Sequence, residues 1–222
     1  MIESHQIKVA RTAHYYTIGQ AGPQVKYLII ACHGYGQLAQ FFLRKFDVLA
    51  REDTLIVAPE GLSRFYWHNG SGKVVASWMT KEDRLSEIAD YAKYLEDLHQ
   101  QYLAQLSPDV QTILFGFSQG CATVVRWPME HFTRFDTLVL WGGMIPEDLD
   151  YKPHADYWAN KKIHAVYGSE DQFITAERIA FHQQLLAEQQ LTAEETVFKG
   201  GHVVDRDALV QLFDQIRLPK VG

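Results

Sequence analysis

The chain has 222 residues, a formal net charge of −6 and a hydrophobic fraction of 47%, which is ordinary for a globular protein. The length fits one domain with a sizeable core, and the negative charge argues against nucleic acid or an anionic membrane as a general partner. No apolar run approaches the roughly 18 residues of a membrane span. The N-terminus lacks a secretory signal pattern, so we expect a cytoplasmic protein without stable membrane insertion.

The first quarter of the chain predicts two buried strands around a loop and a helix. Residues 6–18 predict an edge strand or hairpin, and the continuous apolar run 27–32 predicts a strand buried on both faces. A glycine-punctuated loop at 33–37 follows. The apolar stripe over 38–50 predicts a helix, and 54–58 predicts the next buried strand.

An aromatic-rich segment from residue 60 to 79 interrupts this periodicity. Long structureless loops inside a compact domain are usually functional or disordered, and the many aromatic side chains argue against disorder. Thr80 then resembles a helix N-cap, with Asp83 three residues later. The apolar positions that follow predict a helix ending near Gln105.

The segment Gly116-Phe117-Ser118-Gln119-Gly120 lies between an apolar strand and an apolar helix. It fits the G-x-S-x-G pattern of a nucleophile elbow, in which the serine occupies a strained strand-to-helix turn. The two glycines would let strand and helix pass closely and leave the Ser118 hydroxyl exposed. Free N–H groups at the helix N-terminus would favour developing negative charge there. An ordinary strand-to-helix turn is the alternative interpretation.

The rest of the chain repeats the strand–loop–helix pattern, with an irregular stretch at 144–161. Amphipathic helices are expected around 179–186 and over 204–216. Alternating apolar strands and helices, without an internal repeat, predict one α/β domain over residues 1–222 with a mostly parallel sheet. In such sheets, catalytic groups lie beyond the carboxyl ends of the strands. Further strands are expected at 137–141, 163–167 and 196–198.

A serine that attacks an acyl carbon needs a base to take its proton and an acid to orient that base. Ser118, Asp171 and His202 follow one another in the order expected for a hydrolase sheet, the last two each just past a predicted strand. His202 would accept the serine proton, and Asp171 would hold the imidazole tautomer. The competing acids are Glu170, Asp205 and Asp207.

The tetrahedral intermediate of such a reaction needs two N–H donors. The backbone N–H of Gln119, directly after the serine, would supply one, and that of Tyr35 in the loop after the 27–32 strand would supply the other. We expect His33 to shape this loop and Cys121 to pack in the core. The sequence lacks metal-ligand spacing and a dinucleotide-binding motif, so we expect neither a metal nor a cofactor.

Four motifs together resemble the α/β-hydrolase superfamily, and specifically the small phospholipase/carboxylesterase family that includes acyl-protein thioesterases. The resemblance implies an α/β-hydrolase fold with a minimal lid and a cofactor-free serine esterase that uses Ser118, Asp171 and His202 as its triad. The motifs are His33-Gly34-Tyr35-Gly36, Gly116-Phe117-Ser118-Gln119-Gly120, Gly168-Ser169-Glu170-Asp171 and Gly201-His202.

Departures from the family pattern bear on the substrate. Tyr35 replaces a small aliphatic residue, Cys121 replaces a glycine, and the aromatic loop over 65–78 does not match the thioesterase pattern. We therefore expect a small carboxylic ester rather than a palmitoylated protein as substrate. The alternatives are a lysophospholipase or acyl-thioesterase and, from another class, a non-catalytic hydrolase-fold binding module. Side chains expected to hold the ester are Trp67, Trp78, Trp141 and Met144, with Tyr35. The sequence gives no basis for choosing an oligomeric state.

Overall fold

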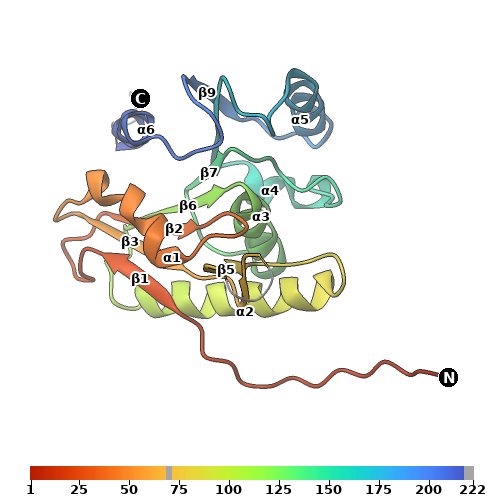
Figure 1. The fold of residues 1–222 in the computed structure, drawn as a ribbon. Helices are drawn as coiled ribbons and strands as arrows, with labels where there is room; N and C mark the ends of the chain where they lie inside the picture. Colours follow the sequence, from red (N-terminus) through yellow and green to blue (C-terminus); the bar gives the residue numbers. More distant parts are fainter. Residues whose placement is uncertain (69–71, 218–222) are drawn as a thin grey trace.

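The computed structural model describes residues 1–68 and 72–217, and within this part of the chain seven strands form the central sheet (Figure 1). The strands are β1 (Tyr15–Ile18), β2 (Tyr27–Cys32), β3 (Thr54–Pro59), β6 (Gln111–Phe117), β7 (Thr137–Trp141), β8 (Lys162–Gly168) and β9 (Glu194–Phe198). They lie in the order β1-β3-β2-β6-β7-β8-β9. Every neighbouring pair is parallel except β1 and β3. The mostly parallel sheet expected from the sequence is confirmed.

Helices cover both faces of this sheet (Figure 1). They are α1 (Ala39–Phe42), α2 (Arg84–Leu103), α3 (Gln119–His131), α4 (Ala155–Trp158), α5 (Ala176–Glu188) and α6 (Arg206–Arg217). Successive strand side chains point to opposite faces. In β2, Leu28 and Ile30 pack with α2 and α3, whereas Ile29 and Ala31 pack with α1 and α6. Both faces are therefore apolar, which is why the parallel strands read as continuous hydrophobic runs.

The segment 38–50 is not the continuous helix that its apolar stripe predicts. It folds as α1 followed by two 3₁₀ turns, Leu43–Lys45 and Asp47–Leu49. A 3₁₀ turn has three residues per turn, so apolar residues spaced by three stay on the core side. The same spacing fits one face of an α-helix, which explains the error. The buried side chains at this spacing are Leu43, Phe46 and Leu49.

The aromatic segment 60–79 contains a β-hairpin that its lost periodicity did not predict. Its strands, β4 (Ser63–Tyr66) and β5 (Val74–Ser77), pair antiparallel. Each strand has only four residues: the alternation of half-buried and exposed side chains in β4 is too short to stand out, and β5 shows no alternation because its last three residues are all buried. A bridge from Ala76 to Gln37 ties the hairpin to the loop after β2. The hairpin therefore packs beside the glycine-rich loop.

The expected N-cap at Thr80 is wrong. Helix α2 begins at Arg84, with Asp83 at the N-cap position. The backbone N–H and hydroxyl of Thr80 both donate to the Glu87 carboxylate, at 2.5 and 3.0 Å. Thr80 therefore contacts the first turn of α2 from outside the helix.

The N-terminal segment forms less regular structure than expected. Of residues 6–18, only β1 (Tyr15–Ile18) is a strand, and it pairs antiparallel with β3 at the sheet edge. Residues 1–14 contain no helix or strand and extend away from the sheet (Figure 1). Gln6 contacts α2 through hydrogen bonds to Asp83 and Ser86. Among the helices described, none has both the length and the apolar character that crossing a bilayer requires.

Candidate active site

Ser118 lies between β6 and α3 with a positive φ of +54° and ψ of −116°. Such a conformation is strained for a residue with a side chain and persists only when its surroundings impose it. Here the close packing of the elbow imposes it. A Cβ on Gly120 would overlap the carbonyl oxygen of Cys32, and one on Gly116 would come within 2.6 Å of the Cα of Cys121. The two glycines are therefore required by the approach of strand, helix and neighbouring strand.

Asp171 and His202 follow β8 and β9, two neighbouring parallel strands whose carboxyl ends lie at the same sheet edge. His202 Nδ1 lies 2.7 Å from Asp171 Oδ2. The other carboxylate oxygen, Oδ1, accepts a hydrogen bond from the backbone N–H of Phe173 at 2.9 Å. Because the Asp171 side chain is only 1% exposed, these bonds fix its orientation. The ionised carboxylate can only accept, so Nδ1 carries the proton and Nε2 is left as the basic nitrogen.

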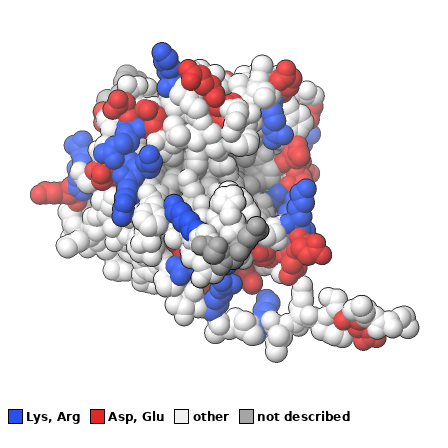
Figure 2. All heavy atoms as spheres, viewed as in Figure 1, with Lys and Arg blue, Asp and Glu red and all other residues white. Residues whose placement is uncertain are grey.

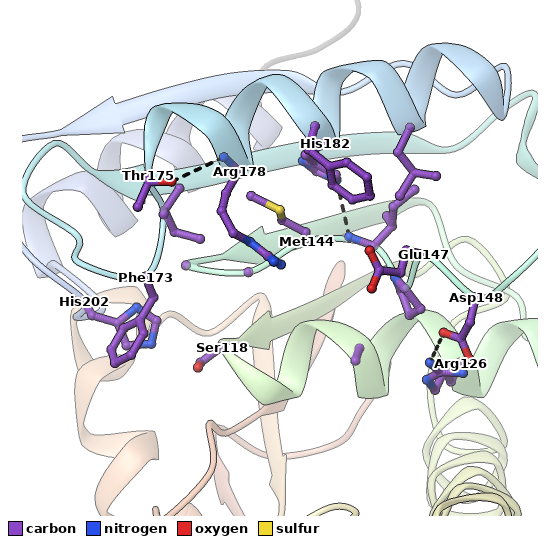
Figure 3. Close-up of a pocket in the computed structure, with 18 of the residues that line it drawn as sticks. Ser118, Arg126, Met144, Glu147, Asp148, Phe173, Thr175, Arg178, His182 and His202 are labelled. Carbon is purple, nitrogen blue, oxygen red and sulfur yellow. Dashed lines mark hydrogen bonds and ion pairs between the residues drawn. The ribbon is translucent and has the colours of Figure 1, made fainter. Parts of the chain in front are cut away.

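Aromatic rings and a glycine fix the imidazole of His202. Its ring centroid lies 4.9 Å from that of Phe117 and 4.7 Å from that of Phe173. A Cβ on Gly142 would come within 3.1 Å of its Cε1 atom. Ser118 and His202 line the same cavity, and Figure 3 shows both at one end of it. No hydrogen bond joins the Ser118 hydroxyl to His202 in this structure, although both residues are described.

The loop after β2 approaches the elbow closely. A Cβ on Gly34 would lie 3.2 Å from that of Ser118. The N–H of Gly34 donates to the Gln37 side chain, and that of Gly36 donates to the Ala76 carbonyl, both at 2.9 Å. Among the described residues, the N–H of Tyr35 between them has no such partner.

Gln119 has two separate features at the elbow. Its backbone N–H begins α3 and has no hydrogen-bond partner among the described residues. Its side chain accepts from the Trp78 N–H at 3.1 Å and donates to the Met79 carbonyl at 2.8 Å. The side chain thus fixes the end of the β4–β5 hairpin segment against the elbow. The elbow motif marks this position, but no local pattern predicts the side-chain contact.

His33 is buried behind the same loop. The N–H of Gly61 donates to its Nε2 at 3.0 Å, so the proton is on Nδ1, which lies 2.8 Å from the Gly34 carbonyl. Burial lowers the pKa of His33 to about 4, which keeps the ring neutral. Its carbonyl also accepts from the Trp78 indole at 2.8 Å. These contacts agree with the expected role of His33 in shaping the loop.

Both cysteines are free and fully buried. The Cys121 thiol lies 3.2 Å from the Gly116 carbonyl oxygen. Burial raises the pKa of this thiol and keeps it protonated. Cys121 therefore packs in the core behind the elbow, as expected.

The cavity beside Ser118 and His202 has a volume of about 710 Å³. This lies within the range of small-molecule sites. Met144, one of the residues expected to hold a substrate, lines it. The loop that carries Met144 is tied to α5, because the N–H of Ile145 donates to the buried His182 Nε2 at 3.3 Å. Burial lowers the pKa of His182 to about 4.

The expected substrate-contacting tryptophans do not line this cavity. Trp78 and Trp141 are core residues, no more than 1% exposed, and their indole N–H groups donate to the carbonyls of His33 and Val203. The prediction that these two side chains contact the substrate is therefore wrong, because each lies inside the domain rather than at its surface. Trp67 is exposed on the β4–β5 hairpin, where its ring centroid lies 5.7 Å from that of Tyr35.

Charged side chains that no sequence motif marks also line this cavity. Their positions are widely separated in the chain and fit no motif, so no local signal could have identified them. The charged residues are Arg84, Arg126, Glu147, Asp148 and Arg178.

Among residues 1–68 and 72–217, no group of three or more His, Cys, Asp or Glu side chains could hold a metal ion.

Comparison with known proteins decides the family. Residues 13–218 match the model of the Phospholipase/Carboxylesterase family, which is nearly the whole chain. The chain belongs to this family. As a phospholipase/carboxylesterase family member with the mostly parallel, helix-flanked sheet described above, it is a serine hydrolase of the α/β-hydrolase fold. No curated protein sequence matches this family member at a significant level.

Solved structures similar to this phospholipase/carboxylesterase family member share its fold at low sequence identity. Acyl-protein thioesterase 2 from Zea mays has a TM-score of 0.69 and 14% identity, covering 92% of this chain and 98% of its own. A phospholipase/carboxylesterase from Dyadobacter fermentans has a TM-score of 0.62 and 18% identity, covering 94% and 98%. YahD, solved with malic acid, has a TM-score of 0.65 and 16% identity, covering 92% and 98%.

Proposed function

We propose that this protein hydrolyses small carboxylic esters with Ser118 as nucleophile, His202 as general base and Asp171 as the acid that orients it. The observation that carries the proposal is the bond of 2.7 Å between His202 Nδ1 and the buried Asp171, with His202 and Ser118 lining one cavity. A serine on a strained elbow, an imidazole with a fixed tautomer and an adjacent small-molecule cavity are the parts that acyl transfer requires.

The reaction has two halves. In the first, the Ser118 oxygen attacks the ester carbonyl carbon while His202 Nε2 accepts the hydroxyl proton. The carbon–oxygen bond to the alcohol then breaks, the alcohol leaves with that proton, and the acyl group remains on Ser118. In the second half, His202 takes a proton from water, whose oxygen attacks the acyl-enzyme. Collapse releases the carboxylic acid and returns the proton to Ser118.

The negative charge on the carbonyl oxygen would be stabilised by the N–H groups of Gln119 and Tyr35. Both are left without a hydrogen-bond partner among the described residues, and the Tyr35 loop abuts Ser118 through Gly34. An unpaired donor at the first turn of α3 also benefits from the helix dipole. Tyr35 needs only its backbone for this role.

A fluorophosphonate probe tests the nucleophile directly. We expect one adduct per chain, mapped to Ser118, and no adduct in Ser118→Ala or in denatured wild type. The same substitution should lower kcat on a 4-nitrophenyl ester by about 10⁶-fold. Folded wild-type protein that stays unlabelled would contradict the proposal and would favour the non-catalytic binding module.

A thioesterase or lysophospholipase acting on longer acyl chains is the second candidate, supported by the structural similarity to an acyl-protein thioesterase. The five charged residues in the cavity wall argue against a long apolar chain, because burying a charged group against hydrocarbon is costly. A panel of esters and thioesters of graded length separates the candidates. We expect kcat/KM to peak at short acyl groups; a rise beyond about eight carbons would favour the second candidate.

Two broader expectations remain predictions. The chain would act as a single domain over residues 1–222, in line with one family match over 13–218. The cytoplasmic location also stays a prediction from the sequence.

A further inference from the structure

The wall of the cavity beside Ser118 differs in charge from the protein as a whole. The chain carries a net charge of −6, and acidic and basic side chains are interspersed over the face in Figure 2. The cavity wall holds three arginines and two carboxylates, a formal charge of +1. A cavity with an excess of cationic groups favours an anionic ligand.

Two of the three arginines are already neutralised in part. Arg126, whose side chain is only 7% exposed, pairs with one oxygen of Asp148, and Arg84 pairs with the other. The Asp148 carboxylate therefore forms ion pairs with both guanidinium groups. This cluster closes the end of the cavity away from Ser118 (Figure 3).

Arg178 is the third arginine and forms no ion pair with any described residue. It lies in the first turn of α5, where its backbone N–H donates to the Thr175 hydroxyl at 3.4 Å. Figure 3 shows its side chain reaching from α5 into the cavity, toward Ser118. A guanidinium group without a partner, in the same cavity as the nucleophile, can bind a carboxylate through two parallel hydrogen bonds.

Glu147 is the opposing group in this wall. It lines the same cavity and forms no ion pair with a described residue. Its carboxylate repels an anion that lies close to it. An anionic substrate group is therefore favoured on the α5 side of the cavity, at Arg178, and not on the side of Glu147.

We propose that the ester attacked by Ser118 carries a free carboxylate, which Arg178 binds. The substrate class is a short ester of a dicarboxylic acid or an equivalent carboxylate-bearing ester, small enough for a cavity of about 710 Å³. This inference rests on the proposed esterase function and adds the charge of its substrate. Arg178 acts as a specificity-determining residue rather than a catalytic one.

Isosteric ester pairs provide the test. Monoethyl succinate, glutarate and adipate are compared with the corresponding ethyl esters in which the carboxylate is a primary amide, and ethanol release is measured. We expect wild type to prefer at least one anionic ester by about 10- to 100-fold in kcat/KM, the range of a charge-assisted hydrogen bond. The preference should weaken as ionic strength rises. The absence of a preference for the anionic ester in all three pairs would overturn the inference.

Substitutions locate the preference. Arg178→Gln should lower the anion-to-amide ratio by at least about tenfold, and Arg178→Lys should lower it less because the charge remains. Glu147→Gln should raise the ratio. Lys93→Gln is the matched control, since it removes one positive charge from an exposed site on α2, and should leave the ratio unchanged. A ratio that Arg178→Gln does not change would also overturn the inference.

Failure of the inference and failure of the proposed function are distinguishable. One outcome is that Ser118 takes the fluorophosphonate label and both ester series are hydrolysed without preference for the anion. The esterase assignment then stands, and only the proposal of a carboxylate-bearing substrate is wrong. If Ser118 is not labelled and neither series is hydrolysed, the esterase function itself is wrong, and the inference fails with it.

Discussion

Asp171 and His202 lie 31 positions apart in the chain, yet their side chains meet at 2.7 Å. The contact follows from topology, because β8 and β9 are adjacent and parallel, so the loops after them leave the same edge of the sheet. The burial of Asp171 and its second bond to the Phe173 N–H leave the carboxylate little freedom. The imidazole therefore receives a fixed partner before any substrate binds.

Asp171→Asn should lower kcat by about 10⁴-fold while KM changes little, because an amide favours the wrong imidazole tautomer. Glu170→Gln is the matched control. The side chain of Glu170, next to Asp171 in the chain, is exposed, so this substitution should leave kcat nearly unchanged. The measurement is steady-state hydrolysis of a short 4-nitrophenyl ester. The reverse outcome, a silent Asp171→Asn and a crippled Glu170→Gln, would assign the acid to Glu170.

Gly120→Ala should destabilise the fold by about 3 kcal/mol or more, because its Cβ would overlap the Cys32 carbonyl oxygen. Backbone atoms of β2 would have to move to make room for the new methyl group. Gly201→Ala is the control, since its Cβ would meet nothing closer than 3.8 Å, and should cost less than about 1 kcal/mol. Denaturant unfolding measures both. Equal, small effects would contradict the close packing of the elbow.

Gln119→Met should lower stability by about 1–3 kcal/mol, since the Trp78 N–H loses its partner and the Met79 carbonyl keeps only the bond from the Ser77 hydroxyl. The backbone N–H at position 119 remains, but the elbow loses its support. We expect kcat to fall by about 10- to 100-fold. Gln101→Met, at an exposed position on α2, serves as control. Unchanged kcat with reduced stability would limit the Gln119 side chain to a structural role.

His99→Leu should make stability less dependent on pH between about 6.5 and 4. Burial lowers the pKa of His99 to about 4, and neither ring nitrogen has a hydrogen-bond partner among the described residues. Below pH 6.5 the unfolded chain gains a proton that the folded chain does not, so stability is lost as pH falls toward 4. The difference is on the order of 3 kcal/mol at this one residue. His33 and His182 act in the same direction.

Urea unfolding at pH 7 and pH 4.5 measures this effect. The His99 variant should lose less stability than wild type across that interval. His5→Leu, at an exposed position in the N-terminal segment, should behave as wild type does. Parallel curves for wild type and His99→Leu would contradict the assignment.

Local sequence rules correctly predicted the mostly parallel sheet and placed the residues of the candidate site at its strand ends. They failed where one pattern fits two structures. The apolar spacing in 38–50 suits both an α-helix and the observed 3₁₀ turns, and the four-residue strands of the hairpin are too short to show a period. Thr80 matched a cap pattern, but its side chain bonds Glu87 instead.

By itself, the sequence determined the elbow at Ser118 and the strand ends that carry Asp171 and His202, because glycine spacing and apolar runs are local constraints on the backbone. Only the tertiary structure decided which side chains line the cavity. It buried Trp78 and Trp141 and brought Arg178 and Met144 to the wall beside Ser118. A cavity forms where loops from separate strands meet, so its lining depends on contacts between residues far apart in the chain, which no local pattern encodes.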